Sequence, residues 1–95
     1  VISGPDYVAS KAGVHGLVRW LARNGAADGV YANAVAPGPV WSPMTEDEPG
    51  YDDGMTPLNR LGEPEDVAEA IVFLSGQGSN WITGTVLDVN GGISI

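Results

Sequence analysis

The sequence predicts an α/β protein whose elements follow the order helix, strand, loop, helix, strand. Two segments carry apolar residues at spacings of three and four, which is the period of a helix with one covered face. Two shorter segments favour strands, and the first is apolar enough to be covered on both faces of a sheet. Because a helix separates the strands, they form a βαβ-type unit of a parallel sheet, which needs further strands and helices to bury it. We therefore expect an α/β domain that is incomplete on its own.

The first helix is expected from about Ser3 to Asn24. Ser3 can cap free amide groups, and Pro5 has a backbone angle suited to the first turn. Gly25 and the pair Asp28-Gly29 then stop the helix. One face of this helix carries residues three and four apart, namely Tyr7, Lys11, Val14, Val18 and Leu21.

The first strand is expected over Val30–Ala36 and ends at Pro37-Gly38-Pro39. No sustained period follows from Val40 to Pro57, which contains prolines, glycines and acidic residues. Such a long loop is either mobile or functional. A solvated surface explains its five acids, which are Glu46, Asp47, Glu48, Asp52 and Asp53.

The second helix is expected from Glu63 to about Ser75, with Pro64 in its first turn and Gly76 ending it. Its apolar face consists of Val67, Ala70, Ile71 and Leu74. The final strand is expected over Thr85–Val89, closed by Asn90-Gly91-Gly92.

Composition excludes several classes of function. The chain has 95 residues, four basic and twelve acidic side chains and a formal charge of −8, so neither nucleic acid nor an anionic membrane is an expected partner. With no cysteine and one histidine there is no disulfide framework and no zinc cluster, and we expect no bound metal. The apolar runs are too short to span a bilayer, and we expect a cytoplasmic location.

Two further patterns are weak. Gly76-Gln77-Gly78 follows a helix instead of a strand and lacks the third glycine of a dinucleotide-binding turn. The acids between Glu46 and Asp53 do not have the spacing of a calcium loop. Neither pattern predicts a site.

The pair Tyr7 and Lys11 offers chemistry because residues four apart lie on the same face of a helix. A phenol ordinarily holds its proton at neutral pH, and a neighbouring ammonium favours the ionised form. Such a tyrosine can give a proton to a substrate oxygen or take one from it. Tyr and Lys at this spacing are also common on solvated helices, so the pair alone does not establish an active site.

The surrounding motifs are more specific. In order along the whole chain they resemble the C-terminal part of the short-chain dehydrogenase/reductase family, nearest to the group of 3-oxoacyl-carrier-protein reductases and glucose dehydrogenases. The matching strings are Tyr7-Val-Ala-Ser-Lys11-Ala-Gly-Val, Asn33-Ala-Val-Ala-Pro-Gly38, Pro57-Leu-Asn-Arg-Leu-Gly-Glu-Pro64, Ile82-Thr-Gly84 and Leu87-Asp-Val-Asn-Gly-Gly92. The resemblance implies a Rossmann-like, doubly wound parallel sheet.

The resemblance also implies roles in hydride transfer between NAD or NADP and a small carbonyl or alcohol substrate. Tyr7 would be the proton donor or acceptor, and Lys11 would favour its ionised form and hydrogen-bond the nicotinamide ribose. Cofactor contacts would also come from residues after the first strand. Pro37-Gly38 would lie beside the nicotinamide, the Val40 backbone would hold its carboxamide, and Ser42 would bond a phosphate in place of the usual threonine.

The loop that follows would bind substrate. Met44 begins the acidic stretch that matches the family's substrate-binding loop, and Trp41 would shape the pocket mouth or simply pack on the loop. Members of the family commonly form tetramers, and residues 63–89 resemble the helix and strand of that interface. A homo-oligomer is therefore expected.

Parts of the family pattern are absent from these residues. The glycine-rich cofactor turn and the Asn of the proton relay are missing, and Ser3 is too close to Tyr7 to be the substrate-orienting serine. With Val1 in place of an initiator Met, we interpret residues 1–95 as the C-terminal portion of one Rossmann-fold domain, inactive alone. The alternative hypothesis is a truncated, non-catalytic assembly module that packs against partner subunits.

Overall fold

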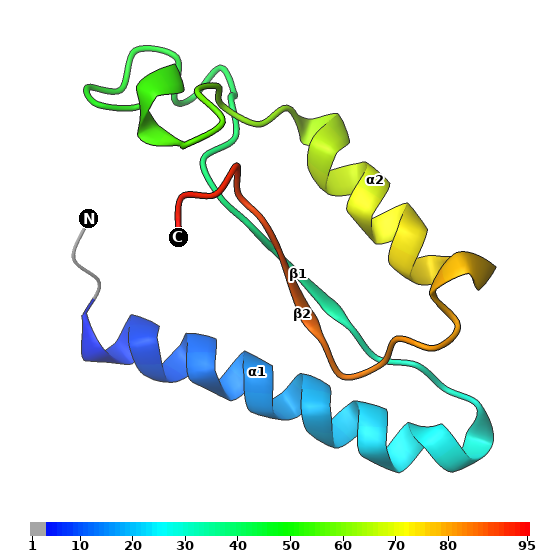
Figure 1. The fold of residues 1–95 in the computed structure, drawn as a ribbon. Helices are drawn as coiled ribbons and strands as arrows, with labels where there is room; N and C mark the ends of the chain where they lie inside the picture. Colours follow the sequence, from blue (N-terminus) through cyan, green and yellow to red (C-terminus); the bar gives the residue numbers. More distant parts are fainter. Residues whose placement is uncertain (1–3) are drawn as a thin grey trace. The chain divides into compact units, whose positions relative to one another are not determined.

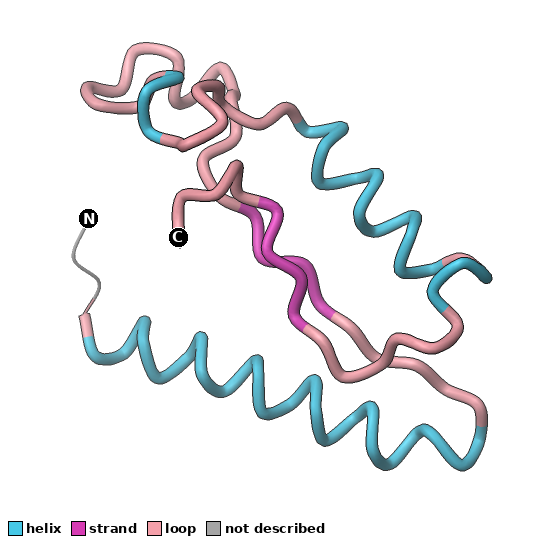
Figure 2. The backbone as a smooth tube through the Cα atoms, in the orientation of Figure 1, coloured by secondary structure: helices cyan, strands magenta, loops and turns pink. Residues whose placement is uncertain are grey.

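The computed structural model describes residues 4–95, and Figure 1 shows the order of their elements. Figure 2 distinguishes helices, strands and the long loop that follows the first strand. The regular elements are α1 (Pro5–Gly25), β1 (Ala34–Pro37), α2 (Pro64–Ser75) and β2 (Val86–Val89), with short 3-10 turns at Ala26–Asp28, Asp53–Met55 and Gln77–Ser79. The predicted order of helix, strand, loop, helix and strand is confirmed.

The helix α1 begins at Pro5, with Gly4 in the extended N-cap position and Asp6 in the first turn. The predicted cap, Ser3, lies outside the described residues. At the other end Gly29 adopts a left-handed conformation (φ 72°) and its N–H donates to the Ala26 carbonyl, so the predicted stop is confirmed. Pro5 stands where its missing N–H costs the helix nothing.

The helix α2 begins one residue later than predicted, because Glu63 is its N-cap. A capping box closes this end: the Asp66 side chain accepts from the Glu63 backbone N–H at 2.7 Å, and the Glu63 side chain accepts from the N–H at the third helical position. Gly76 ends the helix as predicted. The sequence of this first turn therefore fixes where the helix starts.

The strands β1 and β2 pair with each other in a two-stranded sheet. Ala34 N–H donates to the Thr85 carbonyl at 3.0 Å and Gly38 N–H donates to the Val89 carbonyl at 3.0 Å. The numbers rise together on both strands, so the pair is parallel, and α2 lies in the connection between them. The predicted βαβ-type unit is confirmed.

The first strand is shorter than the predicted Val30–Ala36. Residues 30–33 are irregular because Thr83 and Gly84 lie opposite them: Ala32 N–H donates to the Thr83 hydroxyl, and Gly84, at φ 82°, donates its N–H to the Ala32 carbonyl. Regular pairing starts only at Ala34. The strand is half-buried in the described residues, although its apolar sequence predicted cover on both faces.

Contacts group the chain into two compact units, which we describe separately. The first contains α1, the residues up to Ala34, and Asn80–Val86; its buried apolar residues are Val18 and Ala22. Val18 lies on the predicted apolar face of α1, whereas Val14 and Leu21 on that face are exposed. The second unit contains Val35–Ser79 and Leu87–Ile95.

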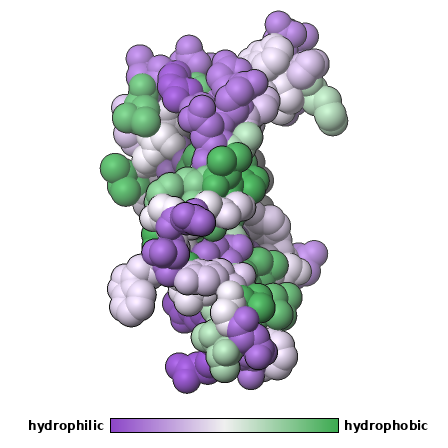
Figure 3. Space-filling model, turned by 90° about the vertical axis from the view of Figure 1, so that its right-hand side faces the viewer, coloured by the Kyte–Doolittle hydropathy of each residue, from purple (hydrophilic) through white to green (hydrophobic). Residues whose placement is uncertain are grey.

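Large apolar side chains remain at the surface of both units, and Figure 3 shows green apolar residues among polar ones on one face. On α2 they are Ile71, Val72 and Phe73, which are 50%, 70% and 49% exposed. Within residues 4–95 we find no helix with the length and apolar character needed to cross a membrane. The exposed helix faces have the character of surfaces that further layers cover in larger α/β proteins.

Candidate active site

The helix α1 carries the pair predicted to do chemistry. Tyr7 lies in its first turn and Lys11 one turn later, so both side chains project from the same face of the helix. Both are exposed, Tyr7 to 55%. With the residues that the structure describes, neither side chain makes a hydrogen bond or an ion pair. Among residues 4–95, no protein group binds the Tyr7 hydroxyl or the Lys11 amine.

The candidate cofactor residues lie in the second unit, where β1 ends. Pro37 is the last residue of β1 and is exposed. Gly38 follows at a position that has no room for a side chain. A Cβ there would lie 2.5 Å from Cβ and 2.7 Å from Cα of Asn90. Only glycine allows β1 and the end of β2 to approach this closely. The structure thus gives Gly38 a packing role, which the sequence analysis did not predict.

Val40 forms an isolated parallel bridge with Gly62. Its own N–H and C=O are both engaged by the Tyr51 hydroxyl, at 3.0 Å and 3.3 Å. The backbone predicted to hold a carboxamide therefore already binds a group that can both donate and accept a hydrogen bond.

Ser42 is half-buried and bonded locally. Its hydroxyl lies 3.2 Å from that of Thr45, and the Thr45 hydroxyl also accepts from Ser42 N–H and donates to the Ser42 carbonyl. This turn holds the Ser42 hydroxyl in place. The candidate substrate residues lie beside it, with Trp41 39% exposed and Met44 91% exposed.

These residues fit a nicotinamide cofactor in their chemistry. The Val40 peptide presents a donor and an acceptor to one side, and a carboxamide has the matching acceptor and donors. In this chain the Tyr51 hydroxyl makes both of these hydrogen bonds: it accepts from the Val40 N–H and donates to the Val40 carbonyl. Tyr7 and Lys11 belong to the first unit, and Pro37, Gly38, Val40 and Ser42 to the second.

Two polar residues, Asn33 and Thr56, make structural hydrogen bonds that the sequence analysis did not predict. Asn33 donates to the Ile82 carbonyl at 3.1 Å and accepts from Thr85 N–H at 3.0 Å, which ties two segments 49 and 52 residues away. In the predicted strand Val30–Ala36, Asn33 is the one polar residue among apolar neighbours, and this position indicates that its side chain has polar partners. Thr56, 6% exposed, binds both backbone groups of Arg60, and nothing local in the sequence indicates this.

Arg60 and Asp66 make a two-pronged ion pair, with guanidinium nitrogens 2.9 Å and 3.2 Å from the carboxylate oxygens. Hydrogen bonding from Arg60, and next from the Glu63 backbone, holds the pKa of Asp66 below its usual value. The hydrogen bond to Asp66, and next the negative charge of that carboxylate, raise the pKa of Arg60. Because Arg60 is exposed and Asp66 is partly exposed, solvent screens this pair.

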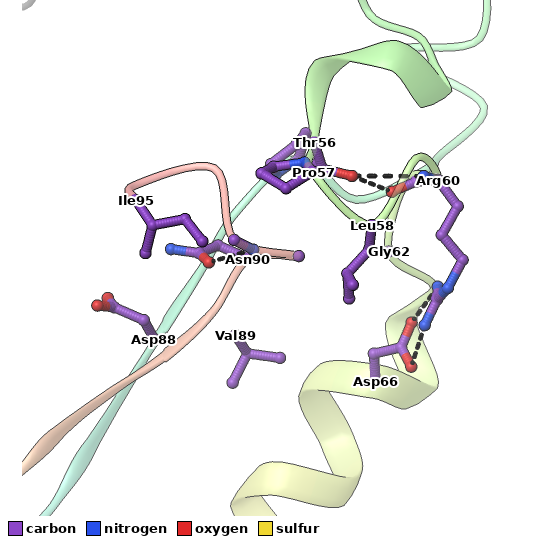
Figure 4. A pocket seen from close by; sticks show the side chains of 13 residues that line it. Thr56, Pro57, Leu58, Arg60, Gly62, Asp66, Asp88, Val89, Asn90 and Ile95 are labelled. Atoms are coloured by element: carbon purple, nitrogen blue, oxygen red, sulfur yellow. Dashed lines mark hydrogen bonds and ion pairs between the residues drawn. The ribbon is translucent and has the colours of Figure 1, made fainter.

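The Arg60–Asp66 pair lies at one side of a hollow of about 410 Å³, and Asp88 and Ile95 lie at the other side (Figure 4). None of the predicted site residues lines it. The hollow lies in the second unit and is distinct from the backbone of Val40 and from the Tyr7 helix.

Known proteins with similar sequences indicate the class of protein to which this chain belongs. A (3R)-3-hydroxyacyl-CoA dehydrogenase from Canis lupus familiaris is 45% identical over 92 residues, covering 93% of this chain and 36% of the relative. The 3-oxoacyl-acyl-carrier-protein reductase FabG of Thermotoga maritima is 42% identical over 94 residues, covering 95% and 38%. These similarities and the parallel βαβ unit are those of an α/β oxidoreductase.

A family model described as Enoyl-(Acyl carrier protein) reductase matches residues 3–94. The chain belongs to the short-chain dehydrogenase/reductase family and matches its C-terminal portion. It spans 36% to 38% of the length of these two curated relatives.

Solved structures agree. A short-chain dehydrogenase/reductase variant from Serratia marcescens superposes with a TM-score of 0.83 at 32% identity, over 94% of this chain and 38% of that one. A blue fluorescent protein from a metagenomic library, solved with NADPH, gives a TM-score of 0.83 at 35% identity over 94% and 37%. The predicted family and Rossmann-like fold are confirmed.

Proposed function

We propose that this chain is the C-terminal, catalytic portion of an NAD- or NADP-dependent dehydrogenase or reductase that acts on a small carbonyl or alcohol. The observation that carries the proposal is the pair of Tyr7 and Lys11, one turn apart on α1, both exposed and without partners among the described residues. The pair occurs in a chain that belongs to the short-chain dehydrogenase/reductase family.

Each residue of the pair has a separate task. In reduction the Tyr7 hydroxyl gives its proton to the substrate oxygen, and in oxidation the same oxygen takes a proton back. The Lys11 side chain assists Tyr7 and hydrogen-bonds the ribose of the cofactor. The nicotinamide supplies or accepts the hydride when it is bound.

Cofactor binding would use the residues after β1. Val40 offers backbone groups to the carboxamide, Ser42 a hydroxyl to a phosphate, and Pro37 and Gly38 form the surface next to the nicotinamide. The NADPH-bound structural relative supports a dinucleotide as the ligand. Because residues 1–95 contain no G-x-G-x-x-G turn between a strand and a helix, we propose that they act together with a nucleotide-binding half.

Substrate binding would use the loop that begins at Trp41 and Met44. Both side chains are exposed apolar groups among acidic neighbours, so they are placed to contact an apolar part of a substrate. The names of the two curated relatives refer to 3-hydroxyacyl and 3-oxoacyl groups, which supports a carbonyl or alcohol on an acyl chain as the substrate.

Replacing Tyr7 by Phe in the full-length gene product tests the proposal. The change removes only the hydroxyl, so turnover should fall about 10²- to 10⁴-fold, which is the contribution of a positioned general acid, while the Kd for NADH or NADPH stays nearly unchanged. Tyr31→Phe is the matched control, because its hydroxyl donates to the Asn80 carbonyl and has no assigned role. Wild-type turnover in the Tyr7 variant would refute the assignment.

A second candidate function is an assembly module that binds no cofactor. It is favoured by the exposed Ile71, Val72 and Phe73 on α2 and by the partly exposed Leu87 on β2, which would pack against other subunits in a tetramer. Fluorescence titration of the full-length gene product with NADH and NADPH separates the two. Saturable binding supports the enzyme, and sedimentation velocity then tests the tetramer.

A further inference from the structure

The peptide groups of Val40 face away from its bridge partner. Trp41 N–H donates to the Gly62 carbonyl at 2.8 Å, and Gly62 N–H donates to the Pro39 carbonyl at 2.9 Å. In a parallel bridge of this kind the bonds come from the residues on either side of the central one. The N–H and C=O of Val40 therefore point together to the opposite side and form a donor and acceptor pair.

The Tyr51 hydroxyl satisfies both members of that pair. It accepts from Val40 N–H at 3.0 Å and donates to the Val40 carbonyl at 3.3 Å, and the contact is partly buried. A phenolic hydroxyl can make both bonds at once because it has one proton and free lone pairs. The longer bond is the weaker one.

Between these two residues the loop is held by short-range bonds. Thr45 N–H donates to the Ser42 carbonyl, Glu48 N–H to the Thr45 carbonyl, and Tyr51 N–H to the Glu48 carbonyl. These are successive local turns. Among the described residues, the Tyr51 hydroxyl is the group that links the far end of this loop to the Val40 backbone.

We propose that the Tyr51 hydroxyl is a displaceable plug on the Val40 peptide, and that a nicotinamide carboxamide and Tyr51 compete for the same two backbone groups. The inference rests on the proposed function, in which Val40 holds the carboxamide. The Val40 N–H has one proton to donate, so a carboxamide oxygen that accepts it must displace the Tyr51 hydroxyl from that bond. Once displaced, the hydroxyl also loses its longer bond to the Val40 carbonyl. The resident plug lowers the apparent affinity, and displacement frees the loop that carries Trp41 and Met44.

Tyr51→Phe in the full-length gene product is the direct test, with Tyr31→Phe as the matched control. Phe keeps the ring and removes the competing hydroxyl, so the Kd for NADH or NADPH should fall about three- to tenfold, the effect of one or two net hydrogen bonds. The control loses a hydroxyl that binds the Asn80 carbonyl and should leave Kd unchanged. Thermal midpoints verify that both variants are folded.

Amide hydrogen exchange at Val40 gives a second readout that is independent of turnover. In the wild type the Val40 N–H should be protected with and without cofactor. In the Phe variant it should exchange faster without cofactor and regain protection when NADPH is added.

The outcomes separate the two proposals. Tighter binding by the Phe variant, with the exchange pattern above, supports the plug, and so does binding that occurs in that variant alone. Saturable wild-type binding with an equal Kd in the Tyr51 and Tyr31 variants overturns the plug and leaves the proposed function standing. No binding by any of the three proteins refutes the proposed function, and the plug falls with it.

Discussion

Gly38 provides the sharpest test of how the two strand ends pack. A Cβ built on Gly38 would lie 2.5 Å from Cβ, 2.7 Å from Cα and 3.3 Å from the carbonyl oxygen of Asn90. Carbon atoms in ordinary contact are about 3.5–4.0 Å apart. Because two of these atoms, Cα and the carbonyl oxygen, belong to the backbone, a rotamer change cannot relieve the overlap. Gly38→Ala therefore requires the end of β2 (Val86–Val89) to move by about 1 Å.

The energetic cost follows from two effects. Forcing an extra carbon into a packed site typically costs about 1–3 kcal/mol. The same movement weakens the bond from Gly38 N–H to the Val89 carbonyl, now 3.0 Å, which contributes about 1 kcal/mol net. We expect Gly38→Ala to lower the free energy of unfolding by roughly 2–4 kcal/mol.

Urea unfolding of the full-length gene product, at fixed protein concentration, measures this loss as a shift in midpoint at constant slope. Gly62→Ala is the matched control: its Cβ would lie 3.5 Å from the Pro39 carbonyl oxygen and from Val40 Cγ2, which is ordinary contact. We expect that control to change stability by less than about 0.5 kcal/mol. Equal midpoints for the two variants would show that the close approach to Asn90 does not constrain Gly38.

Two further predictions concern the turn before α2 (Pro64–Ser75). Thr56→Val keeps the shape of a buried side chain but leaves the N–H and C=O of Arg60 without the Thr56 hydroxyl, so thermal or urea unfolding should show a loss of about 1–3 kcal/mol; a neutral result would mean that water replaces the hydroxyl. Because Arg60 lowers the pKa of Asp66, this carboxylate stabilises the folded state above the unfolded carboxyl value of about 3.9, and the contribution is lost as pH falls through the lower folded value. The difference in urea midpoint between wild type and Asp66→Asn should therefore shrink between pH 7 and pH 2, and a constant difference would contradict this reasoning.

Local signals in the sequence located the helices well. Pro5 and Pro64 stand at first-turn positions, and Gly29 and Gly76 close the helix ends where the chain has to change direction. These signals act within a few residues, so they can be read without knowledge of the fold. The first strand was predicted too early because its start depends on Thr83, which lies 51 residues from its partner Ala32. Thr83 and Gly84 do not continue the ladder opposite residues 30–33.

For the candidate site too, some residues could be predicted from local sequence, and others were found only in the tertiary structure. The four-residue spacing of Tyr7 and Lys11 on a helix was readable from the sequence, since a helix places such residues on one face. The Tyr51 contact with Val40 joins positions eleven residues apart through a loop without periodicity, and no local pattern indicates it. Thr56, in a segment without sequence signal, is buried because its hydroxyl closes the turn to Arg60.

The sequence alone thus determined the family and the order of the elements, and it placed the candidate pair Tyr7 and Lys11 on one helix face, because periodicity, capping and ordered motifs are properties of neighbouring residues. The tertiary structure alone decided that Gly38 must be a glycine beside Asn90, that β1 (Ala34–Pro37) starts only at Ala34, and that the Val40 peptide is engaged by Tyr51. Each of these depends on which distant segments approach one another, and chain folding sets that proximity.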